Sequence, residues 1–258
     1  MTLHPLAENF ASVAGAYERG RPEYAAAVVG ALSAELGVSK GAAVLDLAAG
    51  TGKLTRALLA GGLDVVAVEP QGALREMLCE RVGAERVHEG LAEDIPLADA
   101  SVDAVTVADA FHWFEHAAAL AEIRRVLRPG GGLAVLSTIP DWREASWAKE
   151  LGATMERLRP QHPNFDGPPW KDAVRAAGGW SEPREVRVTT WHRSDPELIV
   201  EYLGSVSWIA ALSEAERAQT LARLGELIAN GETPAEMPLH VVIGLSSHGA
   251  RPPRHPAS

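Results

Sequence analysis

The stretch from residue 44 to residue 55, Val-Leu-Asp-Leu-Ala-Ala-Gly-Thr-Gly-Lys-Leu-Thr, constrains the fold of this chain more than any other feature. An apolar run leads into a short turn that contains Gly50 and Gly52, after which a helical pattern begins. This order predicts a strand–turn–helix unit, with which open α/β sheets hold nucleotide-like ligands at the carboxyl end of a strand. Because glycine has no Cβ and accepts a positive φ, the turn can approach a ligand closely. Asp46, near the strand end, is placed to accept hydrogen bonds from the turn amides or from a cationic ligand group.

Short apolar runs and helical patterns alternate over the first 140 residues. Pro22 is a good residue for the first turn of a helix, so a helix is expected from there toward Gly37. The segment 128–132, Arg-Pro-Gly-Gly-Gly, predicts a stop and a turn before the fifth strand. The alternation predicts an α/β fold, with a parallel sheet covered by helices on both faces. Strands are expected near 43–48, 64–68, 86–89, 103–108 and 132–138, and helices near 53–61, 71–82 and 116–127.

The pattern changes beyond residue 138. The stretch 195–230 predicts two helices, and Leu239–Leu245 a late strand. The tail 247–258 carries three prolines and is expected to be disordered. Residues 140–182 do not read as another strand–helix repeat, because four tryptophans stand there among several prolines: Trp142, Trp147, Trp170 and Trp180.

The residues around the glycine turn also indicate which ligand it holds. A second strand ends in Glu69-Pro70, and a carboxylate roughly 20 residues beyond the glycines suits the two hydroxyls of a ribose. The dinucleotide fingerprint requires a third glycine where this chain has Thr55, which disfavours an NAD(P)-dependent oxidoreductase, the alternative enzyme class. A phosphate-binding P-loop is also absent, since Lys53 is followed by Leu54. A nucleoside with a small zwitterionic tail remains, and S-adenosylmethionine fits this description.

Several further motifs, in order along the chain, resemble one known family. Ala110-Phe111-His112-Trp113-Phe114 follows the fourth predicted strand, and Ala92-Glu93-Asp94-Ile95-Pro96 precedes that strand. With the opening Tyr17…Arg21-Pro22-Glu23-Tyr24, they resemble the class I S-adenosylmethionine-dependent methyltransferases, in particular the small-molecule branch with the type 11 domain. The resemblance implies a Rossmann-like sheet of seven strands whose last strand is antiparallel. It further implies one domain over residues 1–246, with a core at about 40–140 and a cap formed by helices in 5–37 and the insertion 140–182.

The resemblance also implies a set of cofactor-binding residues. Ala92 and Glu93 match the segment that contacts adenine, although Leu91 stands where many relatives have an aspartate. Tyr17 and Arg21, four residues apart, are expected to meet the cofactor carboxylate, unless Arg21 pairs with Glu23 instead. Ala48 replaces the first glycine of the family motif, and the main chain at Asp109 is expected to pass the methionine part. The complete set is Tyr17, Arg21, Asp46, Ala48, Gly50, Thr51, Gly52, Glu69, Pro70, Ala92, Glu93, Asp109 and Ala110.

His112 is the candidate catalytic residue. A hydroxyl or a protonated amine must lose a proton to become a methyl acceptor, and an imidazole with a near-neutral pKa is suited to take it. A carboxylate acceptor needs no base, and His112 then serves only to orient its loop. Oxygen and carboxylate acceptors are favoured over nitrogen and carbon. A module that binds S-adenosylmethionine without chemistry is a third alternative.

Composition limits the partners of the chain. With 24 basic and 34 acidic residues the net charge is −10, and no basic stretch indicates a nucleic-acid substrate, so a small molecule is expected. No apolar run approaches the ~20 residues that span a bilayer, and the N-terminus lacks the layout of a signal peptide. A single cysteine, Cys79, suits a cytoplasmic protein. No His, Cys or carboxylate cluster has metal-ligand spacing, and a monomer or homodimer is expected.

Overall fold

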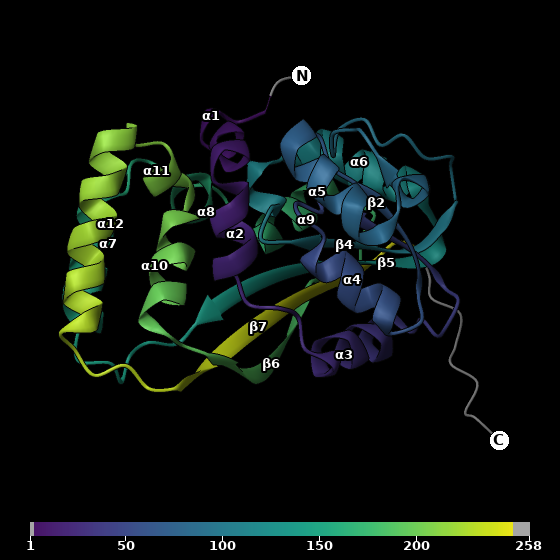
Figure 1. Ribbon diagram of the computed structural model, residues 1–258. Coiled ribbons are helices and arrows are strands. Elements are labelled where there is room, and N and C mark those ends of the chain that lie inside the picture. Colours follow the sequence, from purple (N-terminus) through teal and green to yellow (C-terminus); the bar gives the residue numbers. More distant parts are fainter. Residues whose placement is uncertain (1–2, 250–258) are drawn as a thin grey trace.

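The apolar runs assemble into one mixed sheet in the computed structural model, which describes residues 3–249 (Figure 1). Within these residues the sheet has seven strands in the order β3-β2-β1-β4-β5-β7-β6. β7 is antiparallel to its neighbours β5 and β6, and the other pairs are parallel. The predicted α/β fold and its antiparallel last strand are therefore confirmed. The strands are β1 Ala43–Leu47, β2 Asp64–Val68, β3 Val87–His88, β4 Val102–Ala108, β5 Leu127–Pro140, β6 Arg184–Arg193 and β7 Glu236–Ser247.

Helices cover both faces of the sheet because the central strands are apolar on both sides. Val44 of β1 packs on one face with α3 and α4, while Leu45 packs on the other face with α6 and α9. α5 lies beside α4 and follows β2. The bounds are α3 Ala26–Leu36, α4 Lys53–Ala60, α5 Gly72–Val82, α6 His116–Val126 and α9 Trp170–Ala177, with short 3₁₀ turns η2 Ala84–Arg86 and η3 Phe111–Trp113.

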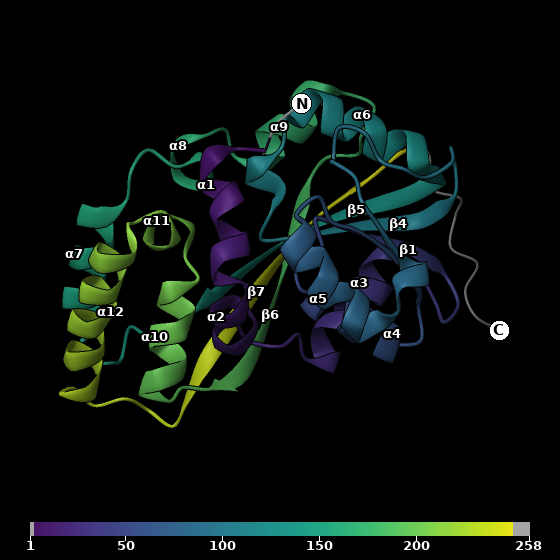
Figure 2. The same ribbon diagram turned by 45° about the horizontal axis from the view of Figure 1, so that its top comes forward.

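A second group of helices stands beyond the carboxyl ends of the parallel strands, where the arrowhead of β5 points (Figures 1 and 2). They have their own apolar core, in which Trp147 and Leu151 meet Leu203, Leu224 and Ile228. This group comprises α1 Pro5–Glu8, η1 Asn9–Val13, α2 Ala14–Gly20, α7 Ala148–Leu158, α8 Pro163–Asp166, α10 Pro196–Gly204, α11 Ser207–Ala210 and α12 Glu214–Ala229.

The contact between α2 and α10 is close because it occurs at a glycine. A Cβ added to Gly20 would lie 2.3 Å from the backbone nitrogen of Tyr202. The N-terminal segment is thereby held against a helix almost two hundred residues further along the chain. This contact brings the start of the chain to the carboxyl edge of the sheet.

Four local predictions were wrong. The helix after Pro22 begins only at Ala26, because the residue before it, Ala25, is still extended (φ −67°, ψ 153°). The stretch 195–230 forms three helices instead of two. β5 begins at Leu127, before the predicted turn, because the glycine-rich segment forms an irregularity inside the strand: Leu127 pairs with Val102 and Gly132 with Ala104.

The fourth correction concerns the tail. Ser247 belongs to β7, and His248 forms a β-bridge with Trp180, so the ordered chain continues past the predicted boundary. The remainder of the predicted tail, 250–258, lies outside the described residues.

Candidate active site

A cavity of about 620 Å³ opens over the carboxyl ends of β1, β2 and β4. This is the edge at which open α/β sheets bind ligands. Its wall brings together eleven of the fourteen predicted site residues from segments far apart in the chain. They are Tyr17, Arg21, Ala48, Gly50, Glu69, Pro70, Ala92, Glu93, Asp109, Ala110 and His112.

The two glycines of the turn have different roles. Gly50 (φ +59°) lines the cavity, and a Cβ added to it would meet nothing within 4 Å, so its backbone faces open space. Gly52 (φ +87°) does not line the cavity: a Cβ there would lie 2.4 Å from Cδ1 of Leu78 in α5. Gly52 is therefore required by the packing of α4 against α5. Ala48 is also left-handed (φ +57°), a conformation that costs an alanine about 1 kcal/mol or more.

Thr51 also faces away from the cavity. Its buried hydroxyl donates to Oε2 of Glu18 at 2.5 Å. Glu18 in turn forms ion pairs with Arg56 and Arg81. Thr51 thus fastens α2 to the glycine turn, and the structure gives it no path to a ligand through its side chain.

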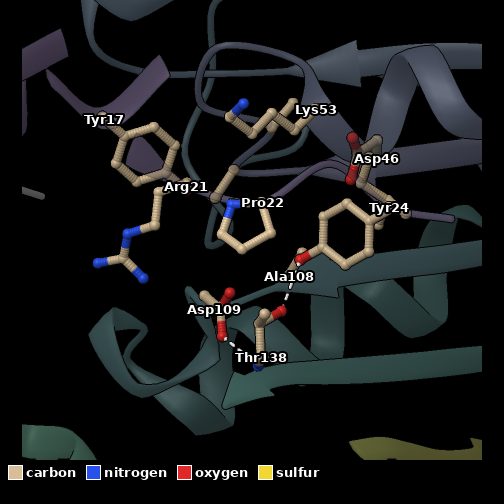
Figure 3. A pocket seen from close by; sticks show the side chains of 12 residues that line it. Tyr17, Arg21, Pro22, Tyr24, Asp46, Lys53, Ala108, Asp109 and Thr138 are labelled. Atoms are coloured by element: carbon tan, nitrogen blue, oxygen red, sulfur yellow. Dashed lines mark hydrogen bonds between the residues drawn. The ribbon is translucent and has the colours of Figure 1, made fainter. Parts of the chain in front are cut away.

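Asp46 is held by the hydroxyls of Thr55 and Thr106 and by a backbone hydrogen bond from Thr55, which belongs to α4 and not to the glycine turn. Oδ2 accepts a hydrogen bond from the hydroxyl of Thr55 at 2.6 Å, and Oδ1 accepts one from Thr106 at 3.2 Å. The carboxyl is 1% exposed, and this burial raises its pKa to about 6. Asp46 touches only a small adjoining cavity of about 30 Å³, which has room for about one water molecule (Figure 3).

Glu69 has the geometry that its position predicted. The carboxyl is 3% exposed, and its oxygens accept hydrogen bonds from the backbone amides of Gly50 at 2.8 Å and Gln71 at 2.9 Å. Each ionised oxygen has a further lone pair for a ligand hydroxyl. Burial raises the pKa of this carboxyl to about 7, despite the two amide donors.

The segment matched to adenine lies beside Glu69 in the cavity wall. Ala92 is buried, and Leu91, Ala92 and Glu93 all line the cavity. Oε1 of Glu93 accepts a hydrogen bond from the backbone amide of Glu115 at 2.7 Å. Since Glu115 is the N-cap of α6, this bond ties the segment to the start of that helix.

Arg21 is held by aromatic and hydroxyl groups. Its Nε donates to Oγ of Ser205 at 2.9 Å, and its guanidinium carbon lies 4.4 Å from the ring centre of Tyr202 and 5.3 Å from that of Tyr17. The alternative pairing with Glu23 does not occur, because Glu23 binds Lys53 and Arg56. Among residues 3–249, no carboxylate oxygen lies within 4 Å of the guanidinium of Arg21, which lines the cavity.

Asp109 faces the same end of the cavity as Arg21 (Figure 3). Its backbone is left-handed (φ +52°), and Oδ1 accepts a hydrogen bond from the amide of Thr138 at 2.8 Å. The Thr138 hydroxyl lies 3.1 Å from the hydroxyl of Tyr24. Burial raises the pKa of Asp109, and the positive charge of Arg21 opposes this shift. The site therefore places one cation and one carboxyl near each other.

His112 lies in η3 at the aromatic end of the cavity. Its ring centre is 4.5 Å from that of Trp113 and 5.4 Å from that of His162. Burial, together with repulsion from His162 and other cationic or titratable neighbours, lowers the pKa of His112 to about 3. His112 is therefore neutral at physiological pH, and its pKa is not the near-neutral value expected of a proton acceptor.

Comparison with known proteins agrees with this geometry. The methyltransferase domain model of the type 11 family matches residues 45–135. An uncharacterized methyltransferase of Mycobacterium tuberculosis is 38% identical over 221 residues, which cover 86% of each chain. The chain belongs to the type 11 methyltransferase family.

This methyltransferase is also similar to a protein of known structure and to an O-methyltransferase. A solved structure of an Anaeromyxobacter dehalogenans protein, proposed to be a type II methyltransferase, has a TM-score of 0.63 and 26% identity, and the match covers 91% of this chain and 99% of the other. A malonyl-[acyl-carrier protein] O-methyltransferase of Pectobacterium atrosepticum is 33% identical over 59% of this chain and 58% of its own length. The predicted enzyme class is confirmed, and an NAD(P)-dependent oxidoreductase is no longer an alternative.

Sequence reasoning missed much of the aromatic wall of this methyltransferase. His162, Phe165, Tyr202 and Trp208 line the cavity, yet they come from α8, α10, α11 and the segment before α8. Of the four tryptophans in residues 140–182, Trp170 lines the cavity. The other three pack elsewhere, Trp142 and Trp147 in the helical core and Trp180 against the sheet core.

Residues 3–249 of the methyltransferase contain neither a candidate membrane-spanning helix nor a candidate metal site. None of their helices is long and apolar enough to cross a membrane. No group of three or more His, Cys, Asp or Glu side chains in this part of the chain is arranged to hold a metal ion.

Proposed function

We propose that this methyltransferase transfers a methyl group to an oxygen atom of a small molecule. S-adenosylmethionine is the methyl donor, as expected for the type 11 family. When bound, it supplies an electrophilic methyl group on a sulfonium. The observation that carries the proposal is that one cavity combines a charged end, suited to this cofactor, with an uncharged end that contains His112.

The charged end fits the chemical groups of the cofactor. We assign the ribose hydroxyls to Glu69, whose carboxylate would make two charge-assisted hydrogen bonds of about 1.5–3 kcal/mol each. The methionine tail is a zwitterion, and Arg21 and Asp109 offer a cation and a carboxyl at the same end of the cavity. The guanidinium of Arg21 lacks an ion-pair partner among residues 3–249, so a ligand carboxylate would satisfy it. Leu91, Ala92 and Glu93 would border the adenine.

The uncharged end favours a hydroxyl acceptor over a carboxylate. Arg21 is the only lysine or arginine among the described residues that line the cavity, and we assign it to the cofactor. A carboxylate acceptor would then lack a cation. His112 is unprotonated at neutral pH because burial lowers its pKa, so a ring nitrogen can accept a hydrogen bond from a hydroxyl. Its low basicity makes it a weak proton acceptor, and we expect its main contribution to be orientation of that hydroxyl. In the transfer the oxygen–methyl bond would form as the sulfonium–methyl bond breaks, S-adenosylhomocysteine would leave, and the hydroxyl proton would pass to solvent. The match to a malonyl-[acyl-carrier protein] O-methyltransferase supports oxygen as the acceptor atom. It does not favour a hydroxyl over a carboxylate, because the free acid group of a malonyl thioester is a carboxylate.

A mass-spectrometric screen tests the proposal. Purified protein with S-adenosylmethionine is incubated with matched small molecules that carry a hydroxyl, a carboxylate or an amine, and products are examined for a gain of one methyl group. His112→Ala should reduce turnover about 10²-fold, at the lower end of the range for a proton acceptor, and should leave the affinity for S-adenosylhomocysteine unchanged. Methylation at nitrogen or carbon alone, or normal turnover in His112→Ala at saturating acceptor, would contradict the assignment.

A further inference from the structure

The part of the cavity away from Glu69 and Arg21 is built from aromatic side chains that contact one another. Trp113 and His162 have ring centres 4.8 Å apart, and His162 lies 5.3 Å from Trp208 and 5.6 Å from Phe165. Phe10 of η1 extends this surface, with its ring centre 6.1 Å from that of Trp113. Four separate segments of the chain therefore form one continuous aromatic surface along the cavity.

Among the described residues, no lysine or arginine other than Arg21 lines the cavity. The nearest cation to this surface is Arg159, whose guanidinium carbon lies 4.6 Å from the ring centre of Phe165 and whose charge is paired with Glu156 and Asp166. The three carboxylates that line the cavity, Glu69, Glu93 and Asp109, lie with the elements of the cofactor end. His162 accepts a hydrogen bond from the amide of Asn164 at Nδ1, so its proton resides on Nε2, which lies 3.0 Å from Oγ of Ser207. Burial lowers the pKa of His162 to about 4, which keeps this ring neutral as well.

The opening of the cavity is also apolar. Phe165 is 55% exposed and Ile139 is 50% exposed, yet both line the cavity, which places them at its mouth. Trp191, the third large apolar side chain exposed in the described part of the chain, lies on β6 and does not line it. Two of the three exposed large apolar side chains thus border this cavity where it meets solvent, as is typical of ligand-binding grooves.

We propose that the methyl acceptor is an uncharged, apolar hydroxyl compound that is long enough to reach from His112 to the mouth at Phe165 and Ile139. This rests on the proposed function and specifies its substrate class. Aromatic side chains would cover the body of the acceptor, and the apolar mouth would contact the end that projects toward solvent. A carboxylate or ammonium on that body would be buried without a partner, which is unfavourable.

Three phenols that each carry a four-carbon para chain test the charge preference: para-butylphenol, para-hydroxyphenylbutanoate and para-(aminobutyl)phenol. Their binding to the full chain is measured by calorimetry in the presence of S-adenosylhomocysteine. The neutral probe should bind at least tenfold more tightly than either charged probe. Equal or tighter binding of a charged probe, or no binding of para-butylphenol up to its solubility limit, would overturn the proposal.

Variants locate the binding surface. Phe165→Ala and Ile139→Ala should each lower the affinity for para-butylphenol several-fold. Trp191→Ala, the matched exposed control, should leave this affinity unchanged. Phe165→Arg should improve binding of the butanoate probe relative to wild type. Equal effects of Phe165→Ala and Trp191→Ala would place the probe elsewhere and refute the assignment. Binding of S-adenosylhomocysteine alone is measured first. If S-adenosylhomocysteine does not bind, the cofactor assignment is contradicted. The relative affinities of the three probes, measured without S-adenosylhomocysteine, would still test the acceptor class.

Discussion

The ionisation of Glu69 predicts how cofactor binding depends on pH. Burial raises the pKa of this carboxyl to about 7, although the amides of Gly50 and Gln71 donate to its oxygens. Only the ionised form accepts hydrogen bonds from two ribose hydroxyls without placing its own proton in their way. Cofactor binding therefore favours the carboxylate and lowers the pKa of Glu69, so that binding near neutral pH releases a proton.

The size of the effect follows from the position of this pKa. With a value of about 7, about one tenth of the free protein has Glu69 ionised at pH 6 and about nine tenths at pH 8. The affinity for S-adenosylhomocysteine should consequently be roughly tenfold higher at pH 8 than at pH 6, equivalent to about 1.4 kcal/mol. Calorimetry in buffers of different ionisation enthalpy measures both the affinity and the number of protons released.

Two variants isolate the contribution of Glu69. Glu69→Gln cannot ionise, and it turns an amide donor toward the backbone amide of Gly50 or Gln71, so its affinity should be weaker than that of wild type at pH 8 and nearly independent of pH. Glu93→Gln removes a carboxyl from the wall of the same cavity and should keep the wild-type pH profile. The reasoning would be refuted if the affinity of the wild type for S-adenosylhomocysteine did not change with pH, or if the affinity of Glu69→Gln changed with pH as much as that of the wild type.

Three substitutions test the frame that supports the site, each by equilibrium unfolding in denaturant. Ala48→Gly should stabilise the protein by roughly 0.5–1 kcal/mol, because it relieves a left-handed alanine; destabilisation would show that the methyl group is needed there. Gly20→Ala should destabilise by about 1–3 kcal/mol, because its Cβ would overlap the backbone at Tyr202, whereas Gly30→Ala in α3 meets nothing within 4 Å and should be neutral or stabilising. Asp46 has a pKa raised to about 6 in the folded protein, so its contribution to the free energy of unfolding is fully present below the ordinary carboxyl pKa of 3.8 and is lost as the pH rises through 6. Asp46→Asn should reduce this loss. If the free energy of unfolding of Asp46→Asn falls with pH as steeply as that of the wild type, the loss does not come from Asp46.

The sheet was predictable because its central strands are buried on both faces. Such strands appear as continuous apolar runs, and all seven of the elements predicted between residues 43 and 127 begin and end within one residue of the observed bounds. The helical layer beyond the sheet was not predictable in the same way. The apolar faces of α10 and α12 pack against Trp147 and Leu151 from a distant segment, and local periodicity contains no information about that partner. β5 was shortened in the prediction because a glycine-rich segment was taken as a turn, whereas the sheet tolerates it as an irregularity.

The same distinction separates the two ends of the active site. Glu69 could be identified from sequence because its distance from the glycine turn places it at the neighbouring strand end, where the fold itself determines the geometry. Thr55 is the opposite case. Its presence argued correctly against a dinucleotide, but only the structure shows that its hydroxyl donates a hydrogen bond to Asp46. The acceptor end depends on contacts between η1, η3, α8 and α11, whose spacing in the sequence has no fixed relation to their positions. Cofactor specificity in this enzyme therefore follows from the sheet, which the sequence pattern encodes locally, whereas acceptor specificity follows from long-range packing of helices and can change without altering the cofactor site.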